Sequence, residues 1–241
     1  MGNRCSKGYW KQMSSPEKLC SQINSLLNTL PLFNDPSEVP FNNGLYFFYE
    51  KGETSKHSPK GRIVRVGNHP RSQDILKRRL RMHYSGGKNG SVFRKFLGGA
   101  MLRQTDPNNT CLQPAPGQGH WEKQDMHTCK NCKPTENRVS ELLRSNFSFR
   151  CIAIENQDLR NMLEKKLIAT ISLCPICKPS DNWLGKFSYS EKVRRSGLWN
   201  SDDVFDQSEV LSIEELLEIE RIVKSTSRLS ISACENLAKE N

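Results

Sequence analysis

Residues 44–50 read GLYFFYE, an aromatic and apolar run with the length and composition of a buried β-strand. The polar loop KGETSKHSPKG follows, and a second apolar run, RIVRVG, occupies residues 62–67. Two such runs joined by a polar loop predict a hairpin with a long connection. A third run, FSFRCIAIE at residues 147–155, predicts another strand.

Segments with helical periodicity surround the three predicted strands. The expected helices cover residues 16–27, 75–83, 91–103, 136–144, 156–172 and 212–224. Ser212 and Glu215 should form a capping box at the start of the last helix. The predicted fold is therefore α+β, with a small, central, mainly antiparallel three-stranded sheet flanked by helices.

Composition divides the chain into three parts. Residues 1–38 are interpreted as an N-terminal helical arm, 39–200 as the main domain, and 201–241 as an acidic C-terminal helical tail. Inside the main domain, residues 104–138 have the composition of a loop. A loop of this length predicts a functional or stapled insertion.

Positive charge is concentrated in one segment. The formal net charge is +10, and residues 60–103 alone hold twelve Lys and Arg against the single acid Asp74. Such a segment is typical of proteins that bind polyanions, although a solvated basic face has the same composition. No segment has the length and apolarity of a membrane span, so we expect a cytoplasmic protein without a membrane partner.

One predicted helix turns two cationic side chains toward its apolar face. With residues 75–83 placed at ~100° per residue, Arg79 and His83 fall inside the apolar arc. A buried guanidinium needs a partner, because an unpaired buried charge costs several kcal/mol. That partner is either an internal carboxylate or a phosphate group. The inward-facing Arg79 favours a polyanion-binding segment over a solvated basic face.

The order of these features resembles the GIY-YIG nuclease family. The matching motifs are Gly44-Leu45-Tyr46, Arg65-Val66-Gly67, Arg79 with His83, Glu164 in MLEKKLI, and Asn182 in PSDNW. The words SVFRKFLGGAML and SGLWN are similar to a restriction-endonuclease-like branch of that family. The resemblance covers roughly residues 39–200. It implies an endonuclease that hydrolyses phosphodiester bonds in DNA with Mg²⁺ or Mn²⁺, with a restriction enzyme as the favoured subclass.

The resemblance also assigns catalytic roles. Tyr46 would help to deprotonate the attacking water, Arg79 would hold a phosphate oxygen, and His83 would assist Tyr46 or protonate the leaving oxygen. Arg65 replaces the usual tyrosine of the second motif. We interpret it as a variant active-site residue that contacts phosphate or favours the Tyr46 phenolate. The structural alternatives are a core tyrosine, an internally paired arginine and a helix-end histidine.

Glu164 and Asn182 complete the implied site. Glu164 lies at the edge of the apolar face of its helix, and the resemblance makes it the Mg²⁺ ligand. Its structural alternative is an i, i+4 ion pair with Arg160. Asn182 would orient groups within the site, and its alternative is a turn-forming residue.

The nine cysteines form an odd set, which argues against a closed disulfide framework. Two Cys-x-x-Cys pairs, Cys129 with Cys132 and Cys174 with Cys177, would supply four thiolates to a structural Zn²⁺. The alternatives are free thiols and a redox pair. Such a zinc would join the insertion to the loop that holds Asn182.

Two functions of different classes remain open. The first is the Mg²⁺-dependent endonuclease, and the second is a catalytically silent nucleic-acid-binding module stabilised by zinc. Both predict salt-sensitive binding to DNA. A nuclease that cuts both strands with one active site per chain would also be a homodimer.

Overall fold

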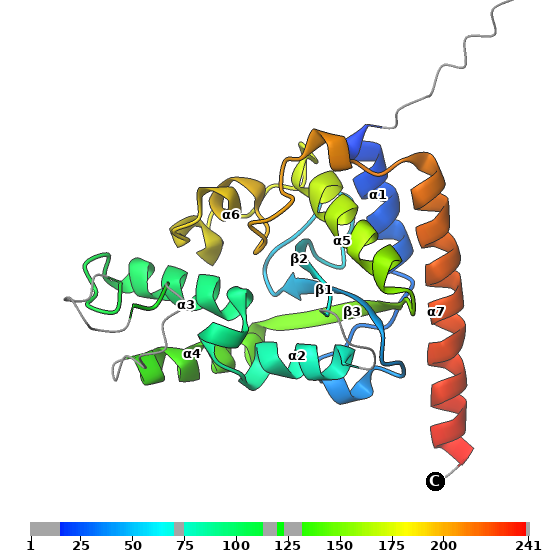
Figure 1. Cartoon of the computed structure of the whole chain (residues 1–241), viewed down its shortest axis with the longest axis horizontal. Helices are drawn as coiled ribbons and strands as arrows, with labels where there is room; N and C mark the ends of the chain where they lie inside the picture. The colour runs from blue at the N-terminus through cyan, green and yellow to red at the C-terminus, as the bar shows by residue number, and fades with distance from the viewer. Residues whose placement is uncertain (1–14, 70–74, 113–119, 123–131, 240–241) are drawn as a thin grey trace, which may run out of the picture.

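The computed structural model describes residues 15–69, 75–112, 120–122 and 132–239. Figure 1 shows the arrangement of its elements. In chain order they are α1 (Pro16–Leu27), η1 (Pro36–Glu38), β1 (Gly44–Glu50), β2 (Ile63–Gly67), α2 (Leu76–Ser85), η2 (Lys88–Gly90), α3 (Val92–Thr105), α4 (Cys132–Asn146), β3 (Phe147–Ala153), α5 (Gln157–Ser172), η3 (Leu184–Phe187), α6 (Glu191–Ser196), η4 (Gln207–Glu209) and α7 (Ile213–Lys239).

The three strands form one antiparallel sheet in the order β2-β1-β3. This confirms the predicted α+β fold with a three-stranded antiparallel sheet. Tyr46 in the central strand pairs with Gly67 of β2 and with Cys151 of β3. Because β1 is the middle strand, its residues set the positions of both neighbours.

Helices cover both faces of the sheet (Figure 1). Leu45 and Phe47 pack on the side that carries α1, α5 and α7, whereas Tyr46 and Phe48 pack on the side that carries α2, α3 and α4. Burial on both faces removes the polar positions that a half-exposed strand would show. This explains why residues 45–49 are apolar or aromatic without a break, before Glu50 ends the strand.

Local signals set several helix ends. The Ser15 hydroxyl accepts the Lys18 N–H at the start of α1, and the Ser212–Glu215 capping box precedes α7 as predicted. Two helices are longer than predicted, since α4 begins at Cys132 and α7 continues to Lys239. No Gly or Pro follows Lys224 to end α7. Within the described residues, no helix combines the length and apolarity needed to cross a bilayer.

The two terminal helices pack against the same core. Leu19 and Ile23 of α1 and Ile219 of α7 are fully buried, and their core also contains residues of α5. α7 also packs along β3. Residues of the predicted arm, main domain and tail thus pack in one apolar layer. The boundaries between these three parts stay predictions.

Candidate active site

Tyr46 lies in the middle of the sheet, on the face that α2 covers. Its ring occupies the space above its cross-strand partner Gly67. A Cβ atom built on Gly67 would lie 2.3 Å from the Tyr46 ring carbon Cζ and 2.4 Å from the hydroxyl oxygen. Position 67 must therefore lack a side chain for Tyr46 to keep this orientation. The contact between Tyr46 and Gly67 thus couples the first motif, residues 44–46, to the second, residues 65–67.

The hydroxyl of Tyr46 is bound by His83 of α2. Tyr46 Oη lies 2.8 Å from His83 Nε2, and His83 Nδ1 lies 2.8 Å from Ser91 Oγ. Ser91 Oγ also accepts the backbone N–H of Arg94 and so caps α3. When Nδ1–H donates to Ser91, Nε2 accepts the Tyr46 O–H, whereas the other tautomer donates a proton to the phenol oxygen. Both tautomers hold the phenol in place.

Tyr46 and His83 form the inner layer of the site, since both are 0% exposed. Burial lowers the pKa of His83 well below its usual value, and the charges of Arg65 and Arg79 lower it further. The imidazole is therefore neutral at pH 7. A buried ring in contact with Tyr46 is placed to assist the phenol. It is poorly placed to protonate a leaving oxygen on a bound substrate.

Arg65 lies beside Tyr46 and faces the outer part of the site. Its guanidinium carbon is 5.1 Å from the Phe93 ring centroid, and Nη1 donates to the Trp199 carbonyl, while Nε has no partner. Burial lowers the pKa of Arg65, and the nearby Tyr46 hydroxyl and Glu164 carboxylate oppose this shift. The cation that replaces a motif tyrosine is therefore held close to both of these groups.

Arg79 lies at the edge of the site and is half-buried, so the expectation of a fully inward guanidinium is only partly met. Nη1 donates to the Gly90 carbonyl at 2.9 Å, and the buried Nε has no partner. Among the described residues, Arg79 makes no ion pair with a carboxylate. Together with Lys88 and Lys95 it lines a cavity of about 90 Å³. A small cavity with three cationic residues suits a phosphate group.

Glu164 reaches this region from α5, on the other side of β2. Asn68, which follows β2, donates its side-chain amide to Asn161 of α5 at 2.8 Å and its backbone N–H to Glu164. The alternative ion pair with Arg160 is not formed. Arg160 instead donates Nη1 to the backbone carbonyls of residues 154 and 155. The Glu164 carboxylate is thus held by the residue that follows β2, and not by an ion pair within α5.

The carboxylate of Glu164 suits a hard divalent cation. Burial raises its pKa to about 7, the charges of Arg65 and Arg79 lower it, and the acid Asp203 raises it. In the part of the chain that the structure describes, Glu164 makes no ion-pair contact, so oxygen lone pairs remain for a metal. Mg²⁺ commonly uses one or two carboxylates and keeps several waters. The donor set therefore fits Mg²⁺. No sequence motif points to Asp203.

Asn182 does not join this group. It is exposed in a turn, and the next residue, Trp183, donates its indole N–H to Glu50 at the far end of β1. A different amide, Asn200, lies beside β2. Its Nδ2 donates to the Val66 carbonyl at 2.9 Å, and its Oδ1 accepts the Val66 N–H at 3.1 Å. Asn200 is the last residue of SGLWN, and this motif was the sequence signal that could have pointed to it.

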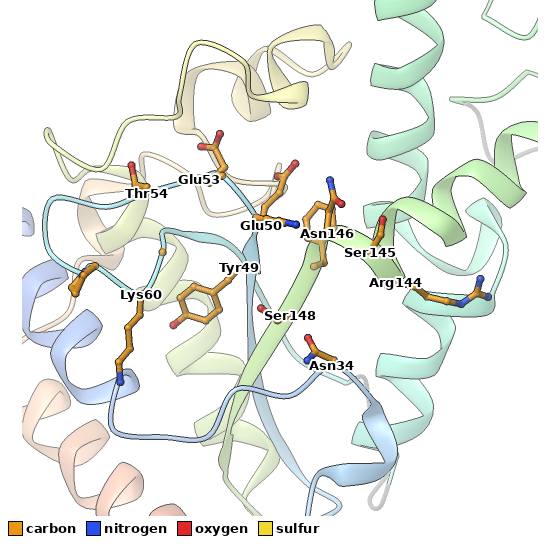
Figure 2. A pocket seen from close by; sticks show the side chains of 15 residues that line it. Asn34, Tyr49, Glu50, Glu53, Thr54, Lys60, Arg144, Ser145, Asn146 and Ser148 are labelled. Carbon is orange, nitrogen blue, oxygen red and sulfur yellow. The ribbon is translucent and has the colours of Figure 1, made fainter.

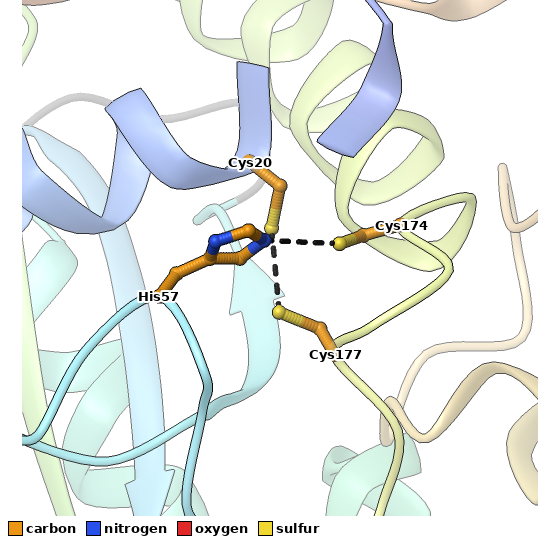
Figure 3. A group of neighbouring side chains, drawn as sticks. All are labelled: Cys20, His57, Cys174 and Cys177. Carbon is orange, nitrogen blue, oxygen red and sulfur yellow. Dashed lines mark hydrogen bonds between the residues drawn. The ribbon is translucent and has the colours of Figure 1, made fainter. Parts of the chain in front are cut away.

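The sulfur ligands gather on the side of the sheet that carries α1 and α5. Cys174 and Cys177 lie together with Cys20 and His57 (Figure 3). The predicted four-cysteine set is corrected here, because Cys132 is buried in the core on the opposite side of the sheet. Cys129 lies outside the described residues. Sequence spacing missed Cys20 and His57 because each is a single residue in a distant segment.

A larger cavity of about 400 Å³ lies at the other end of β1 (Figure 2). Its walls include Glu50, Glu53, Lys60 and Arg144. None of the six predicted catalytic residues lines it. The reaction is therefore not placed in this cavity, despite its greater volume.

A comparison with protein-family models gives one match. The model of the GIY-YIG domain matches residues 19–228, which is most of the chain. No curated protein matches the chain. No solved structure matches it either. The match includes every residue that the structure places in or next to the site.

Proposed function

Since this chain belongs to the GIY-YIG domain family, whose members are endonucleases, we propose that it hydrolyses phosphodiester bonds of DNA with Mg²⁺. One observation carries the proposal: the buried Nε atoms of Arg65 and Arg79 have no partner, and Glu164 makes no ion pair among the described residues. The charges of these three residues influence one another next to the Tyr46–His83 pair. Outside a polyanion site, two such cations would each be expected to contact an internal acid.

Arg79 is the phosphate ligand in this proposal. Its unpaired Nε and the neighbouring lysines of the small cavity supply the positive charge that a phosphate needs. Arg65 is influenced by both Tyr46 and Glu164 and would stabilise negative charge on either the phosphate or the phenol. Glu164 would hold Mg²⁺. The metal would supply Lewis-acid stabilisation of charge on the phosphoryl group.

Tyr46 and His83 handle the proton. With Nδ1–H donated to Ser91, the bare Nε2 of neutral His83 accepts the phenol proton as Tyr46 takes one from the attacking water. Tyr46 has no exposed surface in this structure. Water therefore reaches its hydroxyl only when the outer layer of the site shifts, and DNA binding is the event expected to move it.

Binding to DNA requires cations whose charge is not already neutralised by an internal carboxylate. Several of the basic residues do not qualify, because Arg62, Arg94 and Arg103 form ion pairs with Glu53, Glu136 and Glu122. On α2, Arg78 and Arg81 are exposed next to Arg79 and extend the positive surface. The resemblance in SVFRKFLGGAML and SGLWN favours a restriction-type enzyme. A homodimer that cuts both strands stays a prediction.

Cleavage of supercoiled plasmid and of a mixed DNA library in Mg²⁺ tests the proposal. Glu164→Gln should reduce cleavage at least ~100-fold, because it removes the metal ligand, with DNA binding retained in a mobility-shift assay. The matched control is Glu155→Gln. Glu155 is an exposed acid near the start of α5 whose side chain bonds Asn43, and this variant should cut like the wild type.

The silent module is the competing function, and the Arg65 replacement is the observation that favours it. A wild-type protein that binds DNA but cuts no sequence in the library, in Mg²⁺ or Mn²⁺, would establish that function and refute the nuclease. Equal cutting by wild type and Glu164→Gln would refute the assigned metal ligand. Circular dichroism of each variant shows whether the fold is intact.

A further inference from the structure

Three thiols and one imidazole converge outside the candidate active site. Cys20 comes from α1, His57 from the loop between β1 and β2, and Cys174 and Cys177 from the segment after α5 (Figure 3). Their ligand atoms all lie within 4.8 Å of one another. The three cysteines are buried and His57 is half-buried. Three separate segments of the chain therefore meet through metal-ligand side chains.

The separations match a single tetrahedral metal ion. Zn–S bonds of about 2.3 Å and a Zn–N bond of about 2.0 Å place tetrahedral ligand atoms about 3.8 Å apart for two sulfurs and about 3.5 Å apart for sulfur and nitrogen. The corresponding distances in this structure are 3.6 Å between the sulfurs of Cys20 and Cys177, and 3.3 Å between His57 Nε2 and Cys174 Sγ. A disulfide would require about 2.05 Å between sulfurs.

Hydrogen-bond donors surround the sulfur atoms. Asn24 Nδ2 lies 3.5 Å from Cys20 Sγ, Ser55 Oγ lies 3.4 Å from Cys177 Sγ, and the Ile176 backbone N–H bonds the Cys174 sulfur. Such donors stabilise negative thiolate sulfur and orient the ligands of a metal site. Buried neutral thiols in an apolar core would not need them.

We propose that Cys20, His57, Cys174 and Cys177 bind one structural Zn²⁺. Three thiolates and one imidazole fill all four tetrahedral positions, so no position is open for substrate or water. The compact arrangement fits one ion better than an iron–sulfur cluster, whose ligands are spread over more than one metal atom. The ligand set corrects the prediction from the two Cys-x-x-Cys pairs, because only one of those pairs takes part.

The site joins the N-terminal helix to the sheet and to α5. Cys20 anchors α1, His57 anchors the β1–β2 loop, and Cys174 lies two residues beyond the end of α5. Glu164 is carried by the same helix. The zinc would therefore stabilise the layer behind the cleavage residues while lying outside them. The inference is independent of the proposed nuclease function.

Metal content of the full-length protein, purified without chelators, tests the site. Cys174→Ser should contain one equivalent of zinc less than the wild type. The readout is the difference in zinc content between variant and wild type, so a metal ion bound elsewhere in both proteins does not affect it. The matched control, Cys151→Ala, removes a buried thiol of β3 on the other side of the sheet and should keep the full zinc content.

Two further measurements keep the test decisive if Cys174→Ser does not fold. His57→Ala changes only the half-buried ligand, and its zinc should dissociate at least ~10-fold more readily in a chelator competition. In the wild type, Co²⁺ exchanged into the site should give the thiolate charge-transfer and tetrahedral d–d bands of a site with sulfur ligands. Equal zinc in Cys174→Ser, His57→Ala and wild type would overturn the proposal, as would a Cys174–Cys177 disulfide found in metal-free wild type.

Discussion

At the scale of single residues, the site depends on position 67 being glycine, which has no side chain. Tyr46 and Gly67 face one another across the β1–β2 ladder, and the phenol occupies the place where a Cβ would stand. This contact fixes the phenol against His83 without any bond from Gly67 itself. The glycine of the second motif is therefore required by packing and not by backbone conformation.

Gly67→Ala should reduce both stability and cleavage. The new methyl group overlaps the Tyr46 ring, so we expect about 2 kcal/mol less stability in urea unfolding and a loss of at least ~100-fold in plasmid cleavage, because the phenol is displaced. Gly87→Ala is the control, since a Cβ there meets only the Glu136 side chain at 3.6 Å. Equal stability of the two alanine variants would contradict this account of the motif.

At the scale of elements, β2 is an edge strand of the described sheet, and residues 199 and 200 bind it in place of another strand, the Trp199 N–H donating to the Val64 carbonyl at 2.7 Å. Asn200 binds both backbone groups of Val66, as a paired strand would. The strand carries Arg65 and ends at Gly67. The position of β2 therefore determines where the Arg65 guanidinium lies and where Gly67 leaves room for the Tyr46 ring.

Asn200→Ala should cost about 2 kcal/mol, because it leaves the buried N–H and carbonyl of Val66 without partners. Asn182→Ala is the matched change at the exposed amide, and its unfolding midpoint in urea should stay within experimental error of the wild type. Cleavage should fall with Asn200→Ala and stay unchanged with Asn182→Ala. The reverse pattern would restore the role that the sequence motif gave to Asn182.

At the scale of the whole molecule, a half-buried acid joins β1 to two tryptophans that are distant in the sequence. Glu50 ends β1, and its Oε2 accepts the indole N–H groups of Trp183 and Trp199 at 3.0 and 3.2 Å. Burial raises the pKa of Glu50 to about 7, the two indoles lower it, and the neighbouring charge of Glu53 raises it. The folded protein therefore holds this proton more tightly than the unfolded chain does.

The stability of the protein should consequently fall as the pH rises. The contribution of Glu50 is complete below its unfolded pKa of about 4.5 and is lost as the pH passes its folded pKa of about 7. Glu50→Gln mimics the protonated acid and should remove about 2 kcal/mol of the difference in unfolding free energy between pH 5 and pH 8. Urea unfolding at both pH values measures it. An unchanged difference would show that Glu50 does not titrate in this range.

The sequence by itself determined the strands and the fold class, and it named most residues of the candidate site. GLYFFYE, RIVRVG and FSFRCIAIE became the three strands, and Arg79, His83 and Glu164 lie on the helices where periodicity placed them. These features depend on side chains a few residues apart, whose positions follow from strand and helix geometry. The capping box of α7 belongs to the same class, because its two residues bond each other directly.

Only the tertiary structure decided which distant residues meet. Asn200, and not Asn182, lies beside β2, and Cys20 with His57 takes the place predicted for Cys129 and Cys132 next to Cys174 and Cys177. Arg79 also proved half-buried, because its exposure depends on the neighbouring η2 and α3 segments and not on α2 alone. Long-range packing of whole helices sets these contacts, and no local spacing in the chain encodes them.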